Sequence, residues 1–260
     1  MITRKSQREL DRIRYAASVV GEVLERMHEL AEPGTTTAQL DNAAETLIIE
    51  RGGEPAFKGH GATSRRPPFP AAICASVNDQ IVHGIPDHTA VSEGDLLSVD
   101  VGVRYRGYYG DAATTIAVGQ VRSRARQLVE TCRRSLEMAI AAIGPGRRLS
   151  EVSRTVQREV EGQGFGVVRD LVGHGIGAHL WEEPQVPNYY SRGFPEVVLR
   201  PGMVICIEPM ITEGGWKVKT LDNQWTVATR DGSWAAHFEH TVAITADGVE
   251  ILSLAPDRKR

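Results

Sequence analysis

The chain has 260 residues, of which 41% are hydrophobic and 24% are charged. This composition excludes a disordered chain and supplies enough apolar material for a large packed core. The net charge of −3 at pH 7 argues against nucleic acid as the main partner, because nucleic-acid-binding domains usually present a basic face.

The elements predicted along the chain fall into two similar series. The first 54 residues are predicted to be helical, over 6–30 and 38–51, with a break at Pro33-Gly34. A loop rich in Gly, Pro and Arg follows over 57–70, and strands are predicted at 72–76, 96–105 and 108–118. The second series has helices at 122–143 and 150–161, a break at Pro145-Gly146, and strands at 203–207, 224–229 and 237–244.

Each half, 1–120 and 121–260, therefore has the order helix, Pro-Gly, helix, strands. A Pro-Gly break between helices is common enough to recur by accident, but we interpret the pattern as an internal duplication within a single α+β domain. The two halves would then be related by a pseudo-twofold axis. We expect a functional site between them, because clefts between structural units are favoured ligand sites.

Two aspartates, Asp100 and Asp111, lie on the two strands of one predicted β-hairpin. With a two-residue turn centred between Tyr105 and Arg106, the carboxylates would lie directly opposite each other, with Cβ atoms about 4.5–5.5 Å apart. Two such close carboxylates cannot both ionise cheaply unless a cation lies between them; otherwise the pKa of one is strongly raised. The hairpin alone leaves a metal site and a proton-sharing pair open.

Four further ionisable side chains stand in unusual contexts. His83 and His174 lie in the glycine-containing segments His-Gly-Ile-Pro and Gly-His-Gly-Ile-Gly, while Glu208 ends one apolar segment and Glu239 begins another. A carboxylate in an apolar strand must be paired, protonated or bound to metal. Each position has an ordinary explanation by itself. Taken with the aspartates, four carboxylates and one imidazole make an oxygen-rich set that can hold two divalent ions.

Compartment and assembly are predicted from simpler features. Three cysteines without a CxxC pair are typical of reduced thiols, and the polar N-terminus has no apolar signal core. No run of 18 apolar residues exists in the sequence. We therefore expect a cytoplasmic protein that contacts neither membrane nor nucleic acid and acts as a monomer. We interpret the short basic C-terminus, residues 257–260, as a solvated tail.

The sequence closely resembles type I methionine aminopeptidases, which belong to the pita-bread metallopeptidases. The resemblance runs from the first helix to Leu252 and is carried by the segments 78–86, 98–111, 173–177, 207–210 and 238–241. It implies a creatinase/aminopeptidase fold, with duplicated helices around a curved antiparallel sheet. It also implies removal of the N-terminal methionine from peptides or nascent proteins by a dinuclear metal centre.

The resemblance also assigns roles to residues. It places the metal ligands at Asp100, Asp111, His174, Glu208 and Glu239. They would hold two divalent ions, with Co, Mn, Fe and Zn all compatible with the ligand set. Water activated by the ions would attack the scissile carbonyl, Glu208 would also shuttle protons, and His83 would stabilise developing charge.

One position near the substrate departs from the family pattern. Trp181 stands where the family has a second histidine that contacts the substrate backbone, and a histidine occurs two residues earlier, at His179. In an extended segment these two side chains would point to the same side, so His179 would reach the cleft displaced by about 6–7 Å. The alternative is that His179 is merely exposed and Trp181 closes the pocket.

The predicted substrate pocket differs as well. Phe57 replaces a small residue, His60 replaces a tyrosine, and the loop 61–69 is longer than usual; Cys74 and Trp225 fit the pattern. Phe57 is equally compatible with a place in the core, and Arg65 and Arg66 either attract an acidic substrate or are only solvated. The residues predicted to bind substrate are His83, His179, Trp181, Trp225, Phe57, Phe69 and Cys74.

Three alternative functions stay open. A paralogue with the same metal centre could hydrolyse another N-terminal residue or amide because of Trp181, Phe57 and the loop 61–69. A prolidase- or creatinase-like enzyme generally needs an extra N-terminal domain, for which 260 residues leave no room. A non-catalytic peptide-binding protein of the same fold is the third.

Overall fold

The structure is a computed structural model that describes residues 2–64 and 66–256. Arg65 and residues 257–260, for which roles were predicted, lie outside these ranges. The helices are α1 (Gln7–Leu30), α2 (Thr37–Glu50), α3 (Ser123–Ala142) and α4 (Ser150–Gly162). Within the described residues, no helix is both long and apolar enough to cross a bilayer.

The helix ends follow from local capping. α1 begins after Ser6, whose backbone N–H donates to the carboxylate of Glu9 at 2.7 Å in a capping box. α2 begins after Thr36, whose hydroxyl accepts a hydrogen bond from the backbone N–H of Gln39 at 3.2 Å. All four predicted helices are confirmed to within two residues at each end.

A nine-stranded antiparallel sheet runs through both halves of the chain. Its strand order is β1-β4-β5-β14-β9-β7-β8, with β2 beside β4 and β15 beside β14. The strands are β1 (Glu54–Pro55), β2 (Ile73–Val77), β4 (Leu96–Tyr105), β5 (Tyr108–Ala117), β7 (Gly173–Gly175), β8 (Glu182–Val186), β9 (Val204–Ile207), β14 (Glu239–Ile244) and β15 (Val249–Ile251).

Two small sheets complete the fold. One has the order β13 (Ala235–His237), β10 (Met210–Thr212) and β6 (Gly166–Val167). The other has the order β11 (Val218–Thr220), β12 (Val227–Thr229) and β3 (Gln80–Val82). Apart from β12, which lies within the strand predicted at 224–229, the strands shorter than four residues were missed by sequence analysis, because two or three residues are too few to show an alternating pattern.

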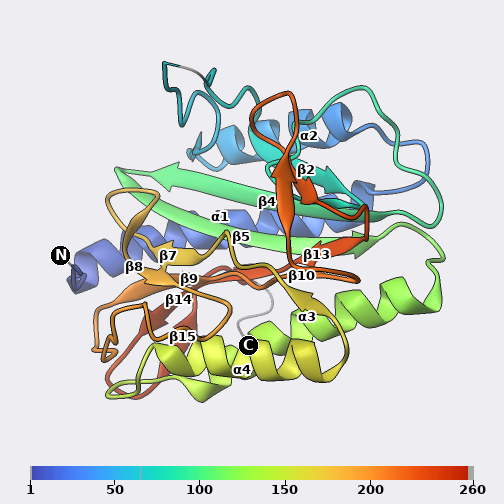
Figure 1. Ribbon diagram of the computed structural model, residues 1–260. Helices are drawn as coiled ribbons and strands as arrows, with labels where there is room; N and C mark the ends of the chain where they lie inside the picture. The colour runs from blue at the N-terminus through green and yellow to red at the C-terminus, as the bar shows by residue number, and fades with distance from the viewer. Residues whose placement is uncertain (1, 65, 257–260) are drawn as a thin grey trace.

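Each half packs its own pair of helices on its own part of the sheet. One apolar cluster joins α1 and α2 to β2, β4 and β5, and a second joins α3 and α4 to β9 and β14. In Figure 1, α1 runs along the long strands β4 and β5, while α3 and α4 lie side by side against the other half. The middle of the sheet, where β5 pairs with β14, is therefore the junction of the two halves.

The predicted register of the β4–β5 hairpin is wrong by one residue in the position of its turn. Tyr105 pairs with Tyr108, so the two-residue turn is Arg106-Gly107, with φ of 47° and 83°. A type I′ turn needs positive φ at both central residues, and glycine supplies it at the second. Asp100 consequently pairs with Ala113, and Asp111 with Gly102.

Candidate metal centre and substrate cavity

The structure brings the five predicted ligands to one cavity of about 570 Å³ at the junction of the two halves. Each comes from a different one of five neighbouring strands in the sheet order β4-β5-β14-β9-β7. The contributing residues are Asp100 on β4, Asp111 on β5, Glu239 at the start of β14, Glu208 directly after β9, and His174 on β7.

Asp100 and Asp111 are diagonal neighbours on the hairpin and not directly opposite, as the register above requires. A shift of the turn by one residue moves the pairing by two residues, so both side chains stay on the same face. The expected closeness of the two carboxylates therefore survives the correction, and repulsion from Asp100 contributes to the raised pKa of Asp111.

Distances between the side chains show a tight cluster. His174 Nε2 lies 3.5 Å from Glu208 Oε1 and 3.9 Å from Asp111 Oδ2. Potential ligand atoms of Asp111, His174, Glu239 and Cys206 all lie within 4.8 Å of one another. Sequence analysis did not assign Cys206 to the site; its thiol is buried, and burial beside the carboxylates raises its pKa well above the ordinary value. The thiol thus lies beside the carboxylates in its neutral form, with Sγ 3.6 Å from Thr241 Oγ1.

The carboxylates are strongly destabilised as anions. Burial raises the pKa of Asp100 to about 7. Burial, and then repulsion from neighbouring carboxylates, raise the pKa values of Asp111, Glu208 and Glu239 well above their usual range. Without a cation, protons must take up part of this charge.

Unpaired oxygen atoms point to the same need. Among the described residues, Asp100 Oδ1, Asp111 Oδ1 and Glu239 Oε1 are buried and have no hydrogen-bond partner. Buried polar atoms are almost always paired, so three orphaned carboxylate oxygens in one cavity indicate a missing electropositive partner. Oxygen ligands with one imidazole suit hard or borderline divalent cations, so the residues fit a metal site.

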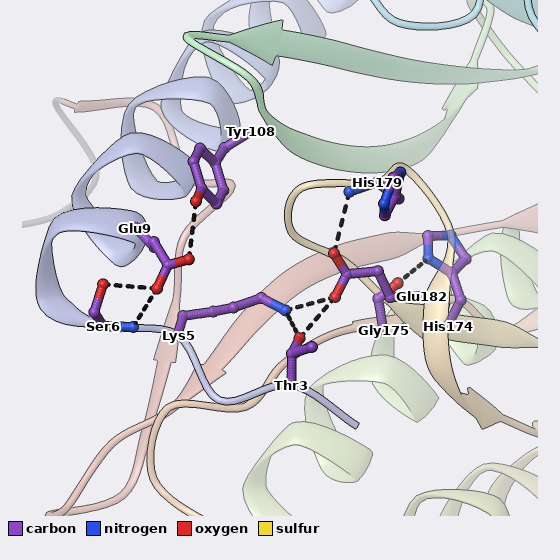
Figure 2. A network of polar contacts seen from close by, with 9 residues as sticks. All are labelled: Thr3, Lys5, Ser6, Glu9, Tyr108, His174, Gly175, His179 and Glu182. Carbon is purple, nitrogen blue, oxygen red and sulfur yellow. Dashed lines mark hydrogen bonds and ion pairs between the residues drawn. The ribbon is translucent and has the colours of Figure 1, made fainter. Parts of the chain in front are cut away.

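His174 is prepared for a role as ligand. Its Nδ1–H donates a hydrogen bond to the backbone carbonyl of Gly175 at 2.9 Å (Figure 2). Nε2 is left on the side of Glu208 and Asp111. Burial lowers the pKa of His174 to about 4, so the imidazole is neutral at physiological pH. A neutral imidazole whose second nitrogen is held by a carbonyl is the usual state of a metal-ligating histidine.

Three other histidines line the cavity, of which His60 lies beside Trp181 and two, His83 and His237, lie deeper. His83 has a φ of 57°, and burial, together with the positive charge of Arg66, lowers its pKa to about 4. His237, which sequence analysis missed, is buried, and neither ring nitrogen has a hydrogen-bond partner in the described part of the chain. Its position two residues before Glu239 was the available signal, because alternate residues of an extended segment share one side.

An aromatic wall forms another part of the cavity. Phe57, Phe69 and Trp225 are buried, and the ring centroids of Phe69 lie 6.5 Å from Phe57 and 5.2 Å from Trp225. Cys74 also lines the cavity. This wall supplies an apolar surface for a substrate side chain, and it shows that Phe57 is both core and cavity lining.

The mouth of the cavity is bordered by an aromatic pair. Trp181 lines the cavity but is 51% exposed, and its ring centroid lies 4.7 Å from that of His60 in an edge-on contact. Burial, and then Arg66, lower the pKa of His60. The pair joins the loop 57–69 to the segment before β8, which come from opposite halves of the chain.

His179 is exposed and does not line the cavity. The expectation of an extended segment through residues 179 and 181 is wrong, because the chain bends over 178–181 and β8 begins only at Glu182. The backbone N–H of His179 donates to Glu182 Oε1 at 3.1 Å, and Glu182 is in turn held by Lys5 (Figure 2). The bend therefore separates the directions of the two side chains.

Comparison with known proteins agrees with this geometry. The family model for metallopeptidase family M24 matches residues 11–246. The chain is 46% identical to methionine aminopeptidase from Clostridium acetobutylicum over 256 residues, which span 98% of this chain and 99% of that one. The crystal structure of methionine aminopeptidase from Thermotoga maritima matches with a TM-score of 0.93 at 44% identity, covering 98% of this chain and 100% of the other.

The chain belongs to metallopeptidase family M24. Within this family, the relatives that match it over nearly their full length carry the name methionine aminopeptidase. The prolidase from Pyrococcus horikoshii matches with a TM-score of 0.75 at 22% identity, and 63% of that chain is covered, which is a likeness of fold alone. The predicted pita-bread fold, a curved antiparallel sheet with two helix pairs, is thereby confirmed.

Proposed function

We propose that this protein is a metalloaminopeptidase that removes the N-terminal methionine from peptides and nascent proteins. The observation that carries the proposal is the convergence of five side chains from five neighbouring strands, with three buried carboxylate oxygens lacking a partner among the described residues. The methionine aminopeptidase relatives at 43–46% identity support the substrate.

Two divalent cations would be held by the five ligands, Asp100, Asp111, His174, Glu208 and Glu239. Such cations supply Lewis acidity and lower the pKa of water towards neutrality, which provides a nucleophile at physiological pH. The cluster's high negative charge would also hold the substrate's free α-ammonium or, through a cation, its free amine. This requirement for a free amino terminus limits cleavage to the first residue.

The remaining side chains position and assist. Glu208 has a raised pKa and faces His174, so its carboxyl group is suited to accept a proton and return it to the leaving amine. His83 is neutral and lines the cavity, where its imidazole would hydrogen-bond the scissile amide as charge develops. Phe57, Phe69, Cys74 and Trp225 would receive the methionine side chain, since a flexible thioether packs well against aromatic rings.

The decisive experiment measures metal content and cleavage together. The purified protein is stripped of metal with a chelator and then reloaded separately with Co, Mn, Fe or Zn. Elemental mass spectrometry should then find about two metal ions per chain. The loaded protein should release methionine from Met-Ala-Ser, and the stripped protein should not. Near-zero metal content together with tight binding of uncleaved peptide would indicate a non-catalytic binding protein.

A second candidate is a paralogue that acts on another N-terminal residue. The exposed Trp181 against His60 at the cavity mouth favours it, because this pair narrows the approach to the site. A panel of X-Ala-Ser tripeptides decides between the two. Methionine should be the preferred first residue under the main proposal, and a different preferred residue would favour the paralogue.

A further inference from the structure

A second cavity adjoins the candidate catalytic cavity on the outer side of β8. It has a volume of about 520 Å³ and lies between β8, the segment 187–197 and the start of α4. Glu183 and Gln185 line both cavities. The two cavities therefore adjoin at these two residues of β8.

The alternation of side chains along β8 explains why the same two residues line both cavities. Glu183 and Gln185 are exposed, whereas Pro184 and Val186 are buried, as expected for a strand with one face in solvent. Trp181, which lines the catalytic cavity and is exposed, directly precedes this strand. β8 is also the last strand in the sheet order, so no further strand of the described chain covers its outer edge.

The direction in which a substrate must leave is set by the catalytic cavity. Asp111 and Glu239 are buried and Asp100 and Glu208 are half-buried, whereas Trp181 lies at the exposed end of the same cavity. If the first residue of a peptide is held at the carboxylates, the residues that follow it must leave the cavity past Trp181. The strip from Trp181 to Gln185 is about 13 Å long, which accommodates about four extended residues.

We propose that the substrate chain downstream of the cleaved bond leaves past Trp181 and lies along the exposed face of β8 into the second cavity. This inference rests on the proposed function and adds an extended polypeptide site to it. The occupant is the substrate's own third to sixth residues. The argument for this occupant is that Glu183 and Gln185 line both cavities and are exposed beyond Trp181, so a chain leaving the first cavity meets the second one next.

The chemistry of the path predicts a charge preference. In the second cavity, Glu196 accepts a hydrogen bond from the Ser150 hydroxyl at 2.9 Å, and the exposed Arg192 supplies a positive charge. Where the two cavities meet, the charged side chain they share is the exposed Glu183 carboxylate, which would face the third and fourth substrate residues. A basic side chain at the third or fourth substrate residue should therefore bind better than an acidic one. Exposed ion pairs are weak, so we expect a preference of about two- to fivefold in kcat/KM.

The first test uses metal-loaded protein and a series Met-Ala-Ser, extended to six residues, with Lys or Glu at the fourth. The kcat/KM value should rise with length and favour Lys. Glu183→Lys should reverse the charge preference, whereas Glu32→Lys, the same charge change at an exposed position that lines neither cavity, should keep it. Gln185→Trp should reduce the ratio of hexapeptide to tripeptide kcat/KM to about one, and the exposed control Gln120→Trp should not.

The second test locates the peptide without turnover. A hexapeptide analogue with a non-hydrolysable first bond and benzoyl-phenylalanine at its fifth residue should photo-crosslink to the segment 187–197. Crosslinks only to the loop 57–69 would overturn the proposal. Cleavage of Met-Ala-Ser with a flat length profile would also overturn it while leaving the proposed function intact. Absence of tripeptide cleavage would instead refute the proposed function.

Discussion

Lys5 Nζ lies 2.5 Å from Glu182 Oε2, in an ion pair whose side chains are only 5% and 11% exposed. The pair joins the segment before α1 to the first residue of β8, next to Trp181 (Figure 2). Although burial raises the pKa of Glu182, hydrogen bonds from Lys5, the His179 backbone and Thr3 together hold it below its ordinary value. The segment before α1 is thus tied by this ion pair to Glu182, which lines the cavity next to Trp181.

Replacing Lys5 should destabilise the fold strongly. Lys5→Met would leave the shielded Glu182 carboxylate without its counter-ion, at a cost of about 3–5 kcal/mol in the free energy of unfolding. Arg14→Met is the matched control, because Arg14 also leads from the N-terminal region to a carboxylate, that of Glu250, but both side chains are about one-third exposed. It should cost about 1 kcal/mol or less. Chemical denaturation measures both, and equal losses would contradict the assigned importance of burial.

The stability of metal-free protein should fall as pH rises. Asp100 has a pKa of about 7 in the folded state, above the ordinary value of 3.8, so the folded protein binds more protons than the unfolded chain between these values. The resulting stabilisation is fully present below the unfolded pKa and is lost as pH rises through the folded one. Asp111, Glu208 and Glu239 act in the same direction.

The buried histidines act in the opposite direction below about pH 6.5, because burial lowers the pKa of His83 and His174 to about 4. We therefore expect chelator-treated protein to lose a few kcal/mol of unfolding free energy, in order of magnitude, between pH 7 and pH 8.5, where the histidines no longer titrate. Addition of Mn²⁺ at pH 8 should restore it, since cations replace protons as partners of the carboxylates. Thermal unfolding at several pH values gives the readout. Metal-free protein that is more stable at pH 8.5 than at pH 7 would show that burial does not destabilise the carboxylates as anions.

Removal of the charge of one proposed ligand should reduce metal binding more than it reduces the stability of the fold. Glu239→Gln keeps the shape of the side chain but should reduce the metal content below two ions per chain. It should also lower kcat/KM by more than about 100-fold, because replacing residues that only hydrogen-bond to metal ligands already costs about 10–100-fold in metal affinity or activity. Glu250→Gln on β15 is the control. Unchanged metal stoichiometry in the Glu239 variant would exclude it as a ligand.

His83 should contribute to turnover and not to metal content. Its φ of 57° suits glycine, so His83→Gly removes the imidazole without imposing backbone strain. We expect kcat to fall by about 10²–10³ while the bound metal is retained. His88→Gly, at an exposed position in the same loop, should change kcat little. A loss of metal from the His83 variant would indicate a structural role instead.

Much of the fold was accessible from local patterns. The helix pairs around Pro33-Gly34 and Pro145-Gly146 were predicted because amphipathic periods and helix-breaking residues act over a few neighbours. The short strands β6, β7 and β13 were not predicted, because two or three residues become a strand only when they hydrogen-bond to a neighbouring strand in the folded protein. The same holds for the hairpin turn, where tertiary pairing shifts Asp100 from Asp111 to Ala113.

The site shows the same division. The resemblance named five candidate ligands, which the structure brings to one cavity, but not Cys206 or His237, which reach the cluster only through the folded sheet. The resemblance also left open whether His179 or Trp181 lines the substrate cavity. The bend over 178–181 decides this, because Trp181 lines the cavity and His179 does not.

The order of residues by itself determined the helices, the long hairpin and the identities of the carboxylates and imidazoles, because these depend on local propensity and side-chain chemistry. Only the tertiary structure decided which five strands become neighbours, which carboxylate oxygens are buried without partners among the described residues, and that Glu183 and Gln185 of β8 line two adjoining cavities. The physical reason is that burial and proximity arise from contacts between segments more than 100 residues apart, such as Asp111 with Thr241, which no local pattern encodes.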